Sequence, residues 1–544
     1  MKELIKYFCS IFFLIIINNL FGNNNYSKEK IIKIADELAD DKFFGRGTGQ
    51  IGGELAANYL DSIFKEIGLK PIGDNGTFRQ NIPFHEITIL QDTELYLLNE
   101  NSKHNLNYFN DFVIYKSGEL SFFPKQTEMI FVGFGIIAPE FDYNDYQRID
   151  VSEKVVVIFS GEPNSQDPDY FDAELPTKYS DIELKQKIAM SRGAKACIII
   201  PNPEELKNYG YPYLQKEYSR NQLSLAYYPS AILTIIINPE KAKLIFENSK
   251  FSYQELLRNF YKNNLSSFEL TSKFSFKGSF KDRNFVASNI IGMIEGSDSK
   301  LKETFVIISA HYDHLGINSP INNDSIYNGY MDNAIGASAL INIAELIINL
   351  KIKTKRSIIF LLTTAEEKGL LGSIFYCNNP VFPLYKTIAN INIDGLASID
   401  EFKSIIGIGA SFSSLKEILS ITASDLNLIV EDLPKNISEN NYFNRSDQIA
   451  FAKAGIPSIL ITDGTDYKNI DKIDGLEKLY DYFSNIYHSP IDDNKQLINY
   501  DATVQHFEFI YKFIINIANS ITEPEWNKDS SFLLERLKTR AEKR

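Results

Sequence analysis

Apolar residues recur at helical spacing in two stretches near the start of the chain. Residues 31–38 carry isoleucine, alanine and leucine three or four positions apart, and Ser27 can cap this predicted helix. A second run over residues 55–67 ends at Gly68, which is typical of a helix stop. Between them, Gly45-Arg46-Gly47 predicts a turn.

The middle of the chain changes to short β-rich runs. Strands are expected at residues 129–132, 155–159, 197–200 and 232–237, with one helix over residues 181–192. Tyrosine, proline and aspartate crowd the joins between these runs. The pattern predicts a separate α+β unit over residues 128–270, a length typical of one domain.

From residue 284 to residue 520, continuous apolar strands alternate with helices. Strands that are apolar on both sides are typical of a largely parallel sheet covered by helices on both faces. We therefore expect an α/β fold with a mixed, largely parallel central sheet flanked by helices, and the smaller α+β unit inserted in it.

The first residues have the pattern of an export signal. Lys2 and Lys6 accompany an apolar run over residues 7–17, and an asparagine-rich stretch follows at residues 23–25. This run is too short to cross a bilayer comfortably, so a signal peptide over residues 1–22 is favoured over an uncleaved membrane anchor. No other stretch is expected to span a membrane, which predicts a periplasmic or extracellular protein.

Composition narrows the function further. The chain has 544 residues, and 56 basic against 70 acidic residues give a formal charge of −14, which argues against a nucleic-acid partner. Beyond the export signal, Cys197 and Cys377 lie in apolar runs of different predicted units. We expect two buried thiols rather than a disulfide.

Three predicted strands deliver polar residues at their carboxyl ends. Residues 305–308 lead to His311 and Asp313, residues 358–362 lead to Glu366-Glu367, and residues 388–393 lead to Asp394. In open α/β sheets, ligands bind beyond the carboxyl ends of the strands, so these side chains are expected to meet in one crevice.

Two further residues extend this cluster. Asp332 directly precedes a long apolar helix, and His488 lies in a loop after the predicted strand at residues 456–461. Histidines with several carboxylates suit zinc, and a pair of zinc ions can share one carboxylate and one hydroxide. The sequence therefore predicts a hydrolase with two metal ions.

At this point the sequence resembles the secreted di-zinc aminopeptidases of the glutamate carboxypeptidase clan. Five stretches carry the resemblance, in the family's order: His311-Tyr312-Asp313-His314-Leu315-Gly316, Met331-Asp332-Asn333-Ala334-Ile335-Gly336, Ala365-Glu366-Glu367-Lys368-Gly369, Asn392-Ile393-Asp394-Gly395 and Tyr487-His488-Ser489-Pro490. Each is a weak motif alone, whereas five in order form a strong signal.

The resemblance implies a role for each matching position. His311 and Asp394 would bind one zinc ion, Glu367 and His488 would bind the other, and Asp332 would bridge the two. The implied roles of the remaining residues are these: Asp313 orients His311 by accepting its other N–H, Glu366 is the general base acting on a metal-bridged hydroxide, Tyr487 hydrogen-bonds the oxyanion, and Arg445 binds substrate. Two zinc ions per chain and peptide or protein substrates are implied.

The resemblance also covers the inserted unit. Phe131-Val132-Gly133-Phe134-Gly135-Ile136, followed by Ala138-Pro139-Glu140, is similar to the protease-associated domain of some family members. The expected organisation is a signal peptide at 1–22, an N-terminal part of the peptidase domain at 26–127, the protease-associated insert at 128–270, the catalytic domain at 284–520 and a tail at 521–544. The segment from Gly464 to His488 is longer than usual for the family, which puts the specificity in doubt.

Simpler roles compete for some of these residues. His85, His104 and His506 lie in no acidic motif, so structural or surface roles are expected for them. His314 is expected to structure its loop rather than to bind metal, and Asp332 could also cap the helix that follows it.

Three functions stay open on the sequence. The first is an aminopeptidase, and the second is a carboxypeptidase or dipeptidase of the same clan with the same metals. The third is a glutaminyl-cyclase-like transferase or a non-catalytic receptor-like protein. A cyclase would hold a single metal ion, and a binding scaffold has no need for uncompensated carboxylates packed together.

Overall fold

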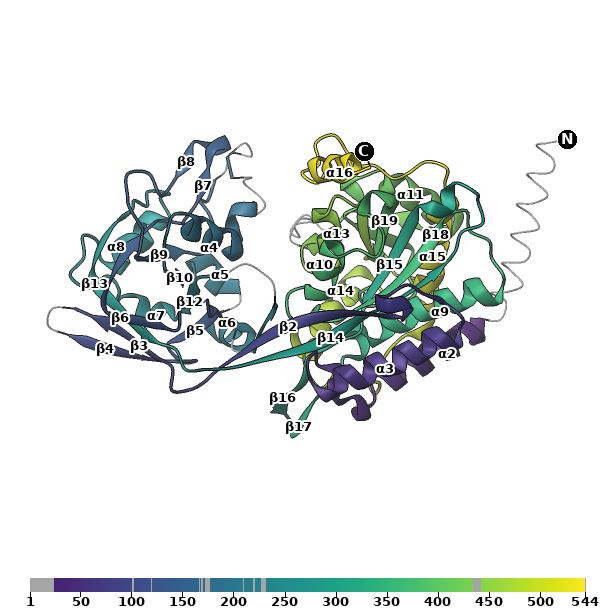
Figure 1. Ribbon diagram of the computed structural model, residues 1–544, viewed down its shortest axis with the longest axis horizontal. Coiled ribbons are helices and arrows are strands. Elements are labelled where there is room, and N and C mark those ends of the chain that lie inside the picture. The colour runs from purple at the N-terminus through teal and green to yellow at the C-terminus, as the bar shows by residue number, and fades with distance from the viewer. Residues whose placement is uncertain are drawn as a thin grey trace. The chain divides into compact units, whose positions relative to one another are not determined.

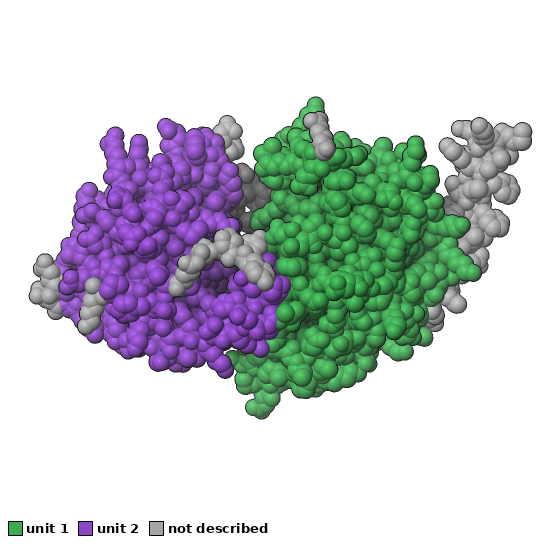
Figure 2. Space-filling model, in the orientation of Figure 1, with its two compact units in different colours: residues 1–82, 286–544 green, residues 83–285 purple. Residues whose placement is uncertain are grey.

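The computed structural model describes residues 24–543, apart from gaps at residues 100–101, 119, 166, 168–169, 172–176, 209, 219–220, 227–230 and 434–441. The chain forms two compact units (Figure 2). Unit 1 contains residues 1–82 and 286–544, and unit 2 contains residues 83–285. The predicted signal peptide lies outside the described residues.

Unit 1 is built on a mixed sheet (Figure 1). Its strands, in spatial order, are β14 (Phe280–Ile294), β18 (Ser357–Thr363), β15 (Phe305–His311), β19 (Thr387–Asn392), β22 (Ser458–Asp463), β20 (Ser404–Ile408) and β21 (Ile429–Val430), with β1 (Lys70–Pro71) paired to β14. The four central strands, from β18 to β22, run parallel, while β14 and β20 run antiparallel to their neighbours β18 and β22. The expected α/β class with a largely parallel central sheet is confirmed.

Helices cover this sheet. They are α2 (Asn24–Leu38), α3 (Ile51–Glu66), α9 (Ile335–Asn349), α10 (Leu371–Asn378), α11 (Leu415–Asp425), α13 (Gln448–Lys453), α14 (Lys472–Asp481), α15 (Tyr500–Asn519) and α16 (Leu533–Ala541). In β15, Val306 and Ile308 pack in a core with α2, α3, α9, α11 and α15, whereas Phe305 and Ile307 pack in a second core with α10 and α13. Burial on both faces explains why these strands are apolar at every position.

One described helical stretch, Tyr330–Asn349, is long and apolar enough to cross a membrane, although the sequence analysis expected none beyond the N-terminus. It includes α9, and 83% of its apolar window is buried inside the protein. Burial against the sheet accounts for its apolar composition, as in the core helix of a large domain.

Unit 2 has its own eight-stranded sheet. In spatial order the strands are β4 (Lys103–Asn107), β3 (Glu94–Leu98), β13 (Phe268–Lys277), β6 (Phe122–Phe131), β9 (Val155–Phe159), β10 (Ala196–Ile200), β12 (Leu233–Ile237) and β5 (Phe112–Lys116). Its helices are α4 (Ile182–Ser191), α5 (Pro203–Asn208), α6 (Gly210–Tyr218), α7 (Pro239–Ala242) and α8 (Tyr253–Phe260). Cys197 of β10, like Cys377 of α10 in unit 1, is a buried free thiol, as expected.

The boundaries of unit 2 differ from the expected range of 128–270. Strands β3, β4 and β5 lie before residue 128 but pair within the unit 2 sheet, β3 with β13 and β5 with β12. Long-range strand pairing therefore adds residues 83–127 to this unit, and sequence order alone does not reveal such pairing. The chain enters unit 2 along β2 (Arg79–Ile89), which pairs there with β11 (Gln222–Leu225), and it leaves along β14.

Shorter elements complete the two units. They are the hairpin β16 (Gly316–Ile321) and β17 (Asp324–Tyr327), the pair β7 (Ile137–Ala138) and β8 (Tyr143–Asn144), and the helical turns Asp41–Arg46, Tyr330–Ala334 and Tyr482–Ile486. The last two turns directly precede α9 and follow α14, and both contribute to the site described next.

Candidate active site

The carboxyl ends of three adjacent parallel strands in unit 1 bring the predicted polar residues together. His311 is the last residue of β15, Glu366 and Glu367 follow β18, and Asp394 follows β19. Because β15 lies between β18 and β19, all three strand ends open at one edge of the sheet.

His311 lies between two carboxylates. Its Nε2 is 3.1 Å from Oδ1 of Asp394 and 3.3 Å from Oδ1 of Asp332. Donor atoms of His311, Glu366 and Asp394 all lie within 4.8 Å of one another. These three residues form one group that could hold a metal ion.

A second group lies on the other side of Asp332. Nε2 of His488 is 3.2 Å from Oδ2 of Asp332 and 3.2 Å from Oε2 of Glu367. The two carboxylate oxygens of Asp332 thus face different histidines, His311 and His488. This is the arrangement expected of a carboxylate shared by two metal ions.

His314 joins this second group, although the sequence analysis expected it to structure its loop. Its Nδ1 is 2.6 Å from Oε1 of Glu367 and 3.8 Å from Oδ2 of Asp332, and its side chain is fully buried. His314, Asp332 and Glu367 meet the distance requirement for a metal group. The signal in the sequence was its place three residues after His311, in the same loop.

Several buried polar atoms in these groups have no hydrogen bond of good geometry among the described residues. They are Nδ1 and Nε2 of His314, Oδ2 of Asp332, Oε1 of Glu367 and Nε2 of His488. Buried polar groups are nearly always paired, so a cluster of nitrogen and oxygen donors with unsatisfied atoms has the chemistry of a cation-binding site. The residues present therefore fit a metal centre, and their chemistry suits zinc.

The carboxylate of Asp313 has a different partner from the one the resemblance implied. Nδ1 of His311 lies 3.1 Å from the main-chain oxygen of Asp313, and 4.0 Å from the nearest carboxylate oxygen. That carboxylate instead accepts hydrogen bonds from the Glu366 main-chain N–H and the Thr48 hydroxyl, at 3.2 and 3.0 Å. Asp313 therefore fixes the loop that carries Glu366, while its main chain orients His311.

The turn at Gly45-Arg46-Gly47 does more than reverse the chain. The Arg46 side chain is completely buried, and its guanidinium donates to the main-chain oxygens of Leu38, Tyr312, Asn328 and Gly329. Gly45 has φ +66°, and a Cβ there would lie 2.4 Å from the Tyr327 oxygen, so only glycine fits. Arg46 thus supplies a buried positive charge that interacts electrostatically with Asp332 and Glu367. The sequence analysis missed this role.

Asp492 fixes the main chain at Asp332 by hydrogen bonds. Its carboxylate accepts the main-chain N–H groups of Met331 and Asp332 at 2.9 and 3.1 Å, and the Gln496 amide at 2.6 Å. The N-cap position of α9 is occupied by Ala334, so Asp332 is not its capping residue. Asp492 is therefore the group that orients the loop before α9, and its position four residues after His488 was the only signal in the sequence.

Burial and neighbouring charges separate the two adjacent glutamates. Burial, with the carboxylates of Asp394 and Glu367 nearby, raises the pKa of Glu366 well above its ordinary value despite the opposing effect of His311. Burial would also raise the pKa of Glu367, but His488 and His314 hold it well below its ordinary value. Glu366 is thus suited to holding a proton, and Glu367 to binding a cation.

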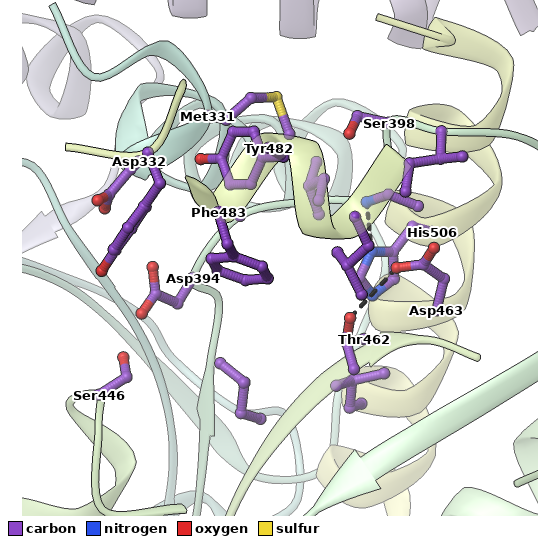
Figure 3. Close-up of a pocket in the computed structure, with 18 of the residues that line it drawn as sticks. Met331, Asp332, Asp394, Ser398, Ser446, Thr462, Asp463, Tyr482, Phe483 and His506 are labelled. Atoms are coloured by element: carbon purple, nitrogen blue, oxygen red, sulfur yellow. Dashed lines mark hydrogen bonds between the residues drawn. The ribbon is translucent and has the colours of Figure 1, made fainter. Parts of the chain in front are cut away.

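A pocket opens beside the metal donors (Figure 3). Its volume is about 210 Å³, and its lining includes Asp332, Asp394, Tyr487 and Arg445. Burial and four nearby carboxylates raise the pKa of Tyr487 well above its ordinary value, so its hydroxyl stays protonated as a hydrogen-bond donor. The side chains of all the predicted site residues therefore surround this pocket or lie at the donor groups beside it.

The fold and this donor set define the class of protein, a metal-dependent hydrolase. Residues 289–514, which carry all of the donors named above, match the model of peptidase family M28. This match, together with the donor set, identifies the protein as a metallopeptidase. A search of curated protein sequences finds no match to the chain.

A solved structure with a TM-score above 0.5 shares the fold, and two others align with the chain at lower scores. The aminopeptidase from Aneurinibacillus sp. strain AM-1 is 17% identical, with 91% of this chain and 95% of that chain aligned, at a TM-score of 0.54. A zinc aminopeptidase from Bacillus subtilis is 17% identical over 90% of this chain and 94% of that one, with a TM-score of 0.43. A peptidase M28 precursor from Shewanella amazonensis is 16% identical, with 92% of this chain and 99% of that chain aligned, also at a TM-score of 0.43.

Proposed function

We propose that this protein is a zinc-dependent aminopeptidase with two zinc ions, and that it releases amino-terminal residues from peptides. The observation that carries the proposal is the position of Asp332, whose two carboxylate oxygens face His311 on one side and His488 on the other. The aminopeptidase from Aneurinibacillus, which shares the fold, supports the choice of reaction.

In this proposal the donors divide into two sets with one shared member. His311 and Asp394 hold one ion, Glu367 and His488 hold the other, and Asp332 belongs to both. His314, 2.6 Å from Glu367, either fixes that ligand or joins the second set. When bound, zinc lowers the pKa of water and polarises the carbonyl group that is to be cleaved.

The chain's own residues supply proton transfer and positioning. Glu366 takes a proton from the attacking water and gives it to the leaving amine, a role suited to a buried carboxyl with a raised pKa. Asp313 holds the Glu366 main-chain N–H, and Tyr487 can donate a hydrogen bond to the oxygen on which negative charge develops. Arg445, exposed at the pocket, is placed to bind substrate.

The first experiment is hydrolysis of aminoacyl p-nitroanilides with and without chelator and restored zinc, beside amino-blocked peptides. We expect zinc-dependent cleavage of free-amine substrates only. Cleavage of amino-blocked peptides from the carboxyl end would instead identify a carboxypeptidase. One bound metal ion with cyclisation of amino-terminal glutamine would identify a cyclase.

Two variants test the division of roles between the adjacent glutamates. Glu366→Gln should keep both zinc ions and lose roughly 10²–10⁴-fold in kcat, because only proton transfer is removed. Glu367→Ala should lose metal. The exposed Glu417→Gln serves as the matched control and should change neither. Full activity of Glu366→Gln would refute the assigned mechanism.

Two expectations from the sequence also remain proposals. We propose that unit 2 is a protease-associated domain without catalytic residues, because the donors lie in unit 1. We also propose export through the apolar segment at residues 7–17, which cell fractionation and amino-terminal sequencing of the mature protein would test.

A further inference from the structure

The pocket beside the metal donors has two chemically different sides. Asp394 and Ser446 lie on one side, and Thr462, Asp463 and His506 lie on the other, with Phe483 between them (Figure 3). The first side contains the reacting centre. The second side is therefore where a substrate side chain would end.

The pocket lining also includes several apolar side chains. The helical segment that runs from α14 to residue 486 contributes Leu479, Tyr482 and Phe483, and the β-strand side contributes Leu460. This segment lies within the stretch between Gly464 and His488, which the sequence analysis found longer than usual for the family. It therefore helps to shape the pocket, and its walls suit an aliphatic or aromatic side chain.

Asp463, at the end of β22, is an acidic group on the side of the pocket away from Asp394 (Figure 3). Its carboxylate accepts two long hydrogen bonds, from the Thr462 hydroxyl at 3.2 Å and from the Tyr467 hydroxyl at 3.3 Å. Burial raises its pKa to about 6, so it is ionised at neutral pH. Among the described residues, no cationic group contributes to its titration.

The neighbouring histidine supplies no charge either. Nδ1 of His506 accepts the Ala397 main-chain N–H at 3.0 Å, and burial lowers its pKa to about 4. His506 is thus neutral when Asp463 is charged. Arg445 is the one arginine or lysine among the described residues that line the pocket, and it is adjacent to Ser446 on the opposite side.

We propose that Asp463 makes this pocket a subsite for a basic side chain, so that the enzyme prefers lysine or arginine at the amino terminus of its substrate. The proposal rests on the aminopeptidase function proposed above and names its substrate class. The methylene groups of lysine or arginine would lie along Leu460 and Phe483, and the charged end would meet Asp463. An ionised carboxylate that lacks a cation in an enclosed site gains more from such a partner than an exposed one would.

The test compares side chains of similar length with and without charge. The kcat/KM values for lysine and arginine p-nitroanilides should exceed those for methionine and glutamine by about 10- to 100-fold, the range expected for a hydrogen bond to a charged group. Glutamine is the control for polarity without charge, and methionine for length without polarity. Equal or higher kcat/KM for methionine would overturn the proposal.

Three variants assign the preference to Asp463. Asp463→Asn should lower kcat/KM for lysine and arginine by about 10- to 100-fold and leave methionine within about threefold. Asp463→Glu, which keeps the charge, should retain the basic preference. Asp466→Asn is the matched control, because Asp466 lies three residues away with a 56% exposed side chain and does not line the pocket. An unchanged preference in Asp463→Asn would refute the subsite.

Binding separates failure of the subsite from failure of the aminopeptidase function. Calorimetry with lysinamide and norleucinamide reads the pocket without turnover, and tighter binding of lysinamide that is lost in Asp463→Asn is expected. If no anilide is cleaved but lysinamide still binds more tightly, the proposed function fails and the subsite is supported. Equal affinities for the two amides overturn the subsite, whether or not peptides are cleaved.

Discussion

Both units contain charged side chains that are withdrawn from water, but they provide different hydrogen-bond partners for them. In unit 2 the carboxylate of Asp145 accepts the main-chain N–H groups of Phe134 and Ile136, both at 3.0 Å, and the Tyr143 hydroxyl at 2.8 Å. Nearby, the completely buried Lys185 donates to the Phe134 main-chain oxygen at 2.7 Å. Both carboxylate oxygens of Asp145 are therefore used within the fold.

The buried charges of unit 1 are arranged differently. Four side chains form ion-pair contacts there: Asp332, Glu367, His314 and His488. Each of them nevertheless has at least one buried atom that makes no hydrogen bond. Folding has brought these groups out of water next to one another, with several of their polar atoms left without a hydrogen bond. Such a cluster is costly in itself, so it is expected where a ligand completes it.

The comparison shows how a structural buried charge differs from a functional one: the hydrogen-bonding atoms of the structural charge all have partners within the fold, and those of the functional charge do not. Burial alone does not make this distinction, because Lys185 and Asp332 are both buried and Asp145 is partly buried. The following experiments test this distinction, from the largest expected effect to the smallest.

Removing the shared carboxylate should have the largest effect. Asp332→Asn should bind less metal and lose on the order of 10³-fold in kcat/KM, because both donor sets lose a member. Asp145→Asn, the matched change in unit 2, should keep activity within about twofold. Metal analysis and p-nitroanilide kinetics measure both, and comparable losses in the two variants would contradict the distinction.

Metal removal should lower the stability of the protein by a large amount. A ligand present at about 1,000 times its Kd stabilises the folded state by about 4 kcal/mol, so chelation should lower the unfolding temperature and zinc should restore it. Calorimetric scans measure the shift. In Asp332→Asn, chelator should have little further effect, and a full shift in that variant would mean that metal stabilises the chain elsewhere.

In unit 2, loss of partners should cost stability without affecting chemistry. Asp145→Ala leaves the Phe134 and Ile136 N–H groups unpaired, which should lower the free energy of unfolding by about 1–3 kcal/mol. Urea unfolding measures the loss, with Asp150→Ala, an exposed aspartate of the same unit, as the control. If Asp145→Ala unfolds like the wild-type protein, its hydrogen bonds contribute nothing.

The smallest effect is a pH dependence at the same residue. Burial raises the pKa of Asp145 to about 6 from an ordinary value of 3.8, so the folded state binds more protons than the unfolded state between these pH values. This contribution to stability is therefore present below about pH 4 and lost as pH rises through 6. Asp145→Asn cannot titrate, so its deficit relative to wild type should shrink between pH 4 and pH 7. A constant deficit in urea unfolding would exclude the shift.

The sequence by itself determined the elements of unit 1 and the residues at its site. Apolar runs predicted β15, β18 and β19, because a strand buried on both faces must be apolar at every position. The polar residues that end these runs, from His311 to Asp394, stood out against that background. Local sequence carries this information because each strand and its terminal ligand are neighbours in the chain.

Tertiary structure alone decided which distant residues support the site. Arg46 reaches the main-chain oxygen of Tyr312 across 266 residues, and Thr48 reaches Asp313 across 265. The start of unit 2 at residue 83 depends on strand pairing of the same long range, as does the position of Asp463 beside His506 in the pocket. No local pattern marks these residues, because their roles arise from contacts that exist only after the sheet has assembled.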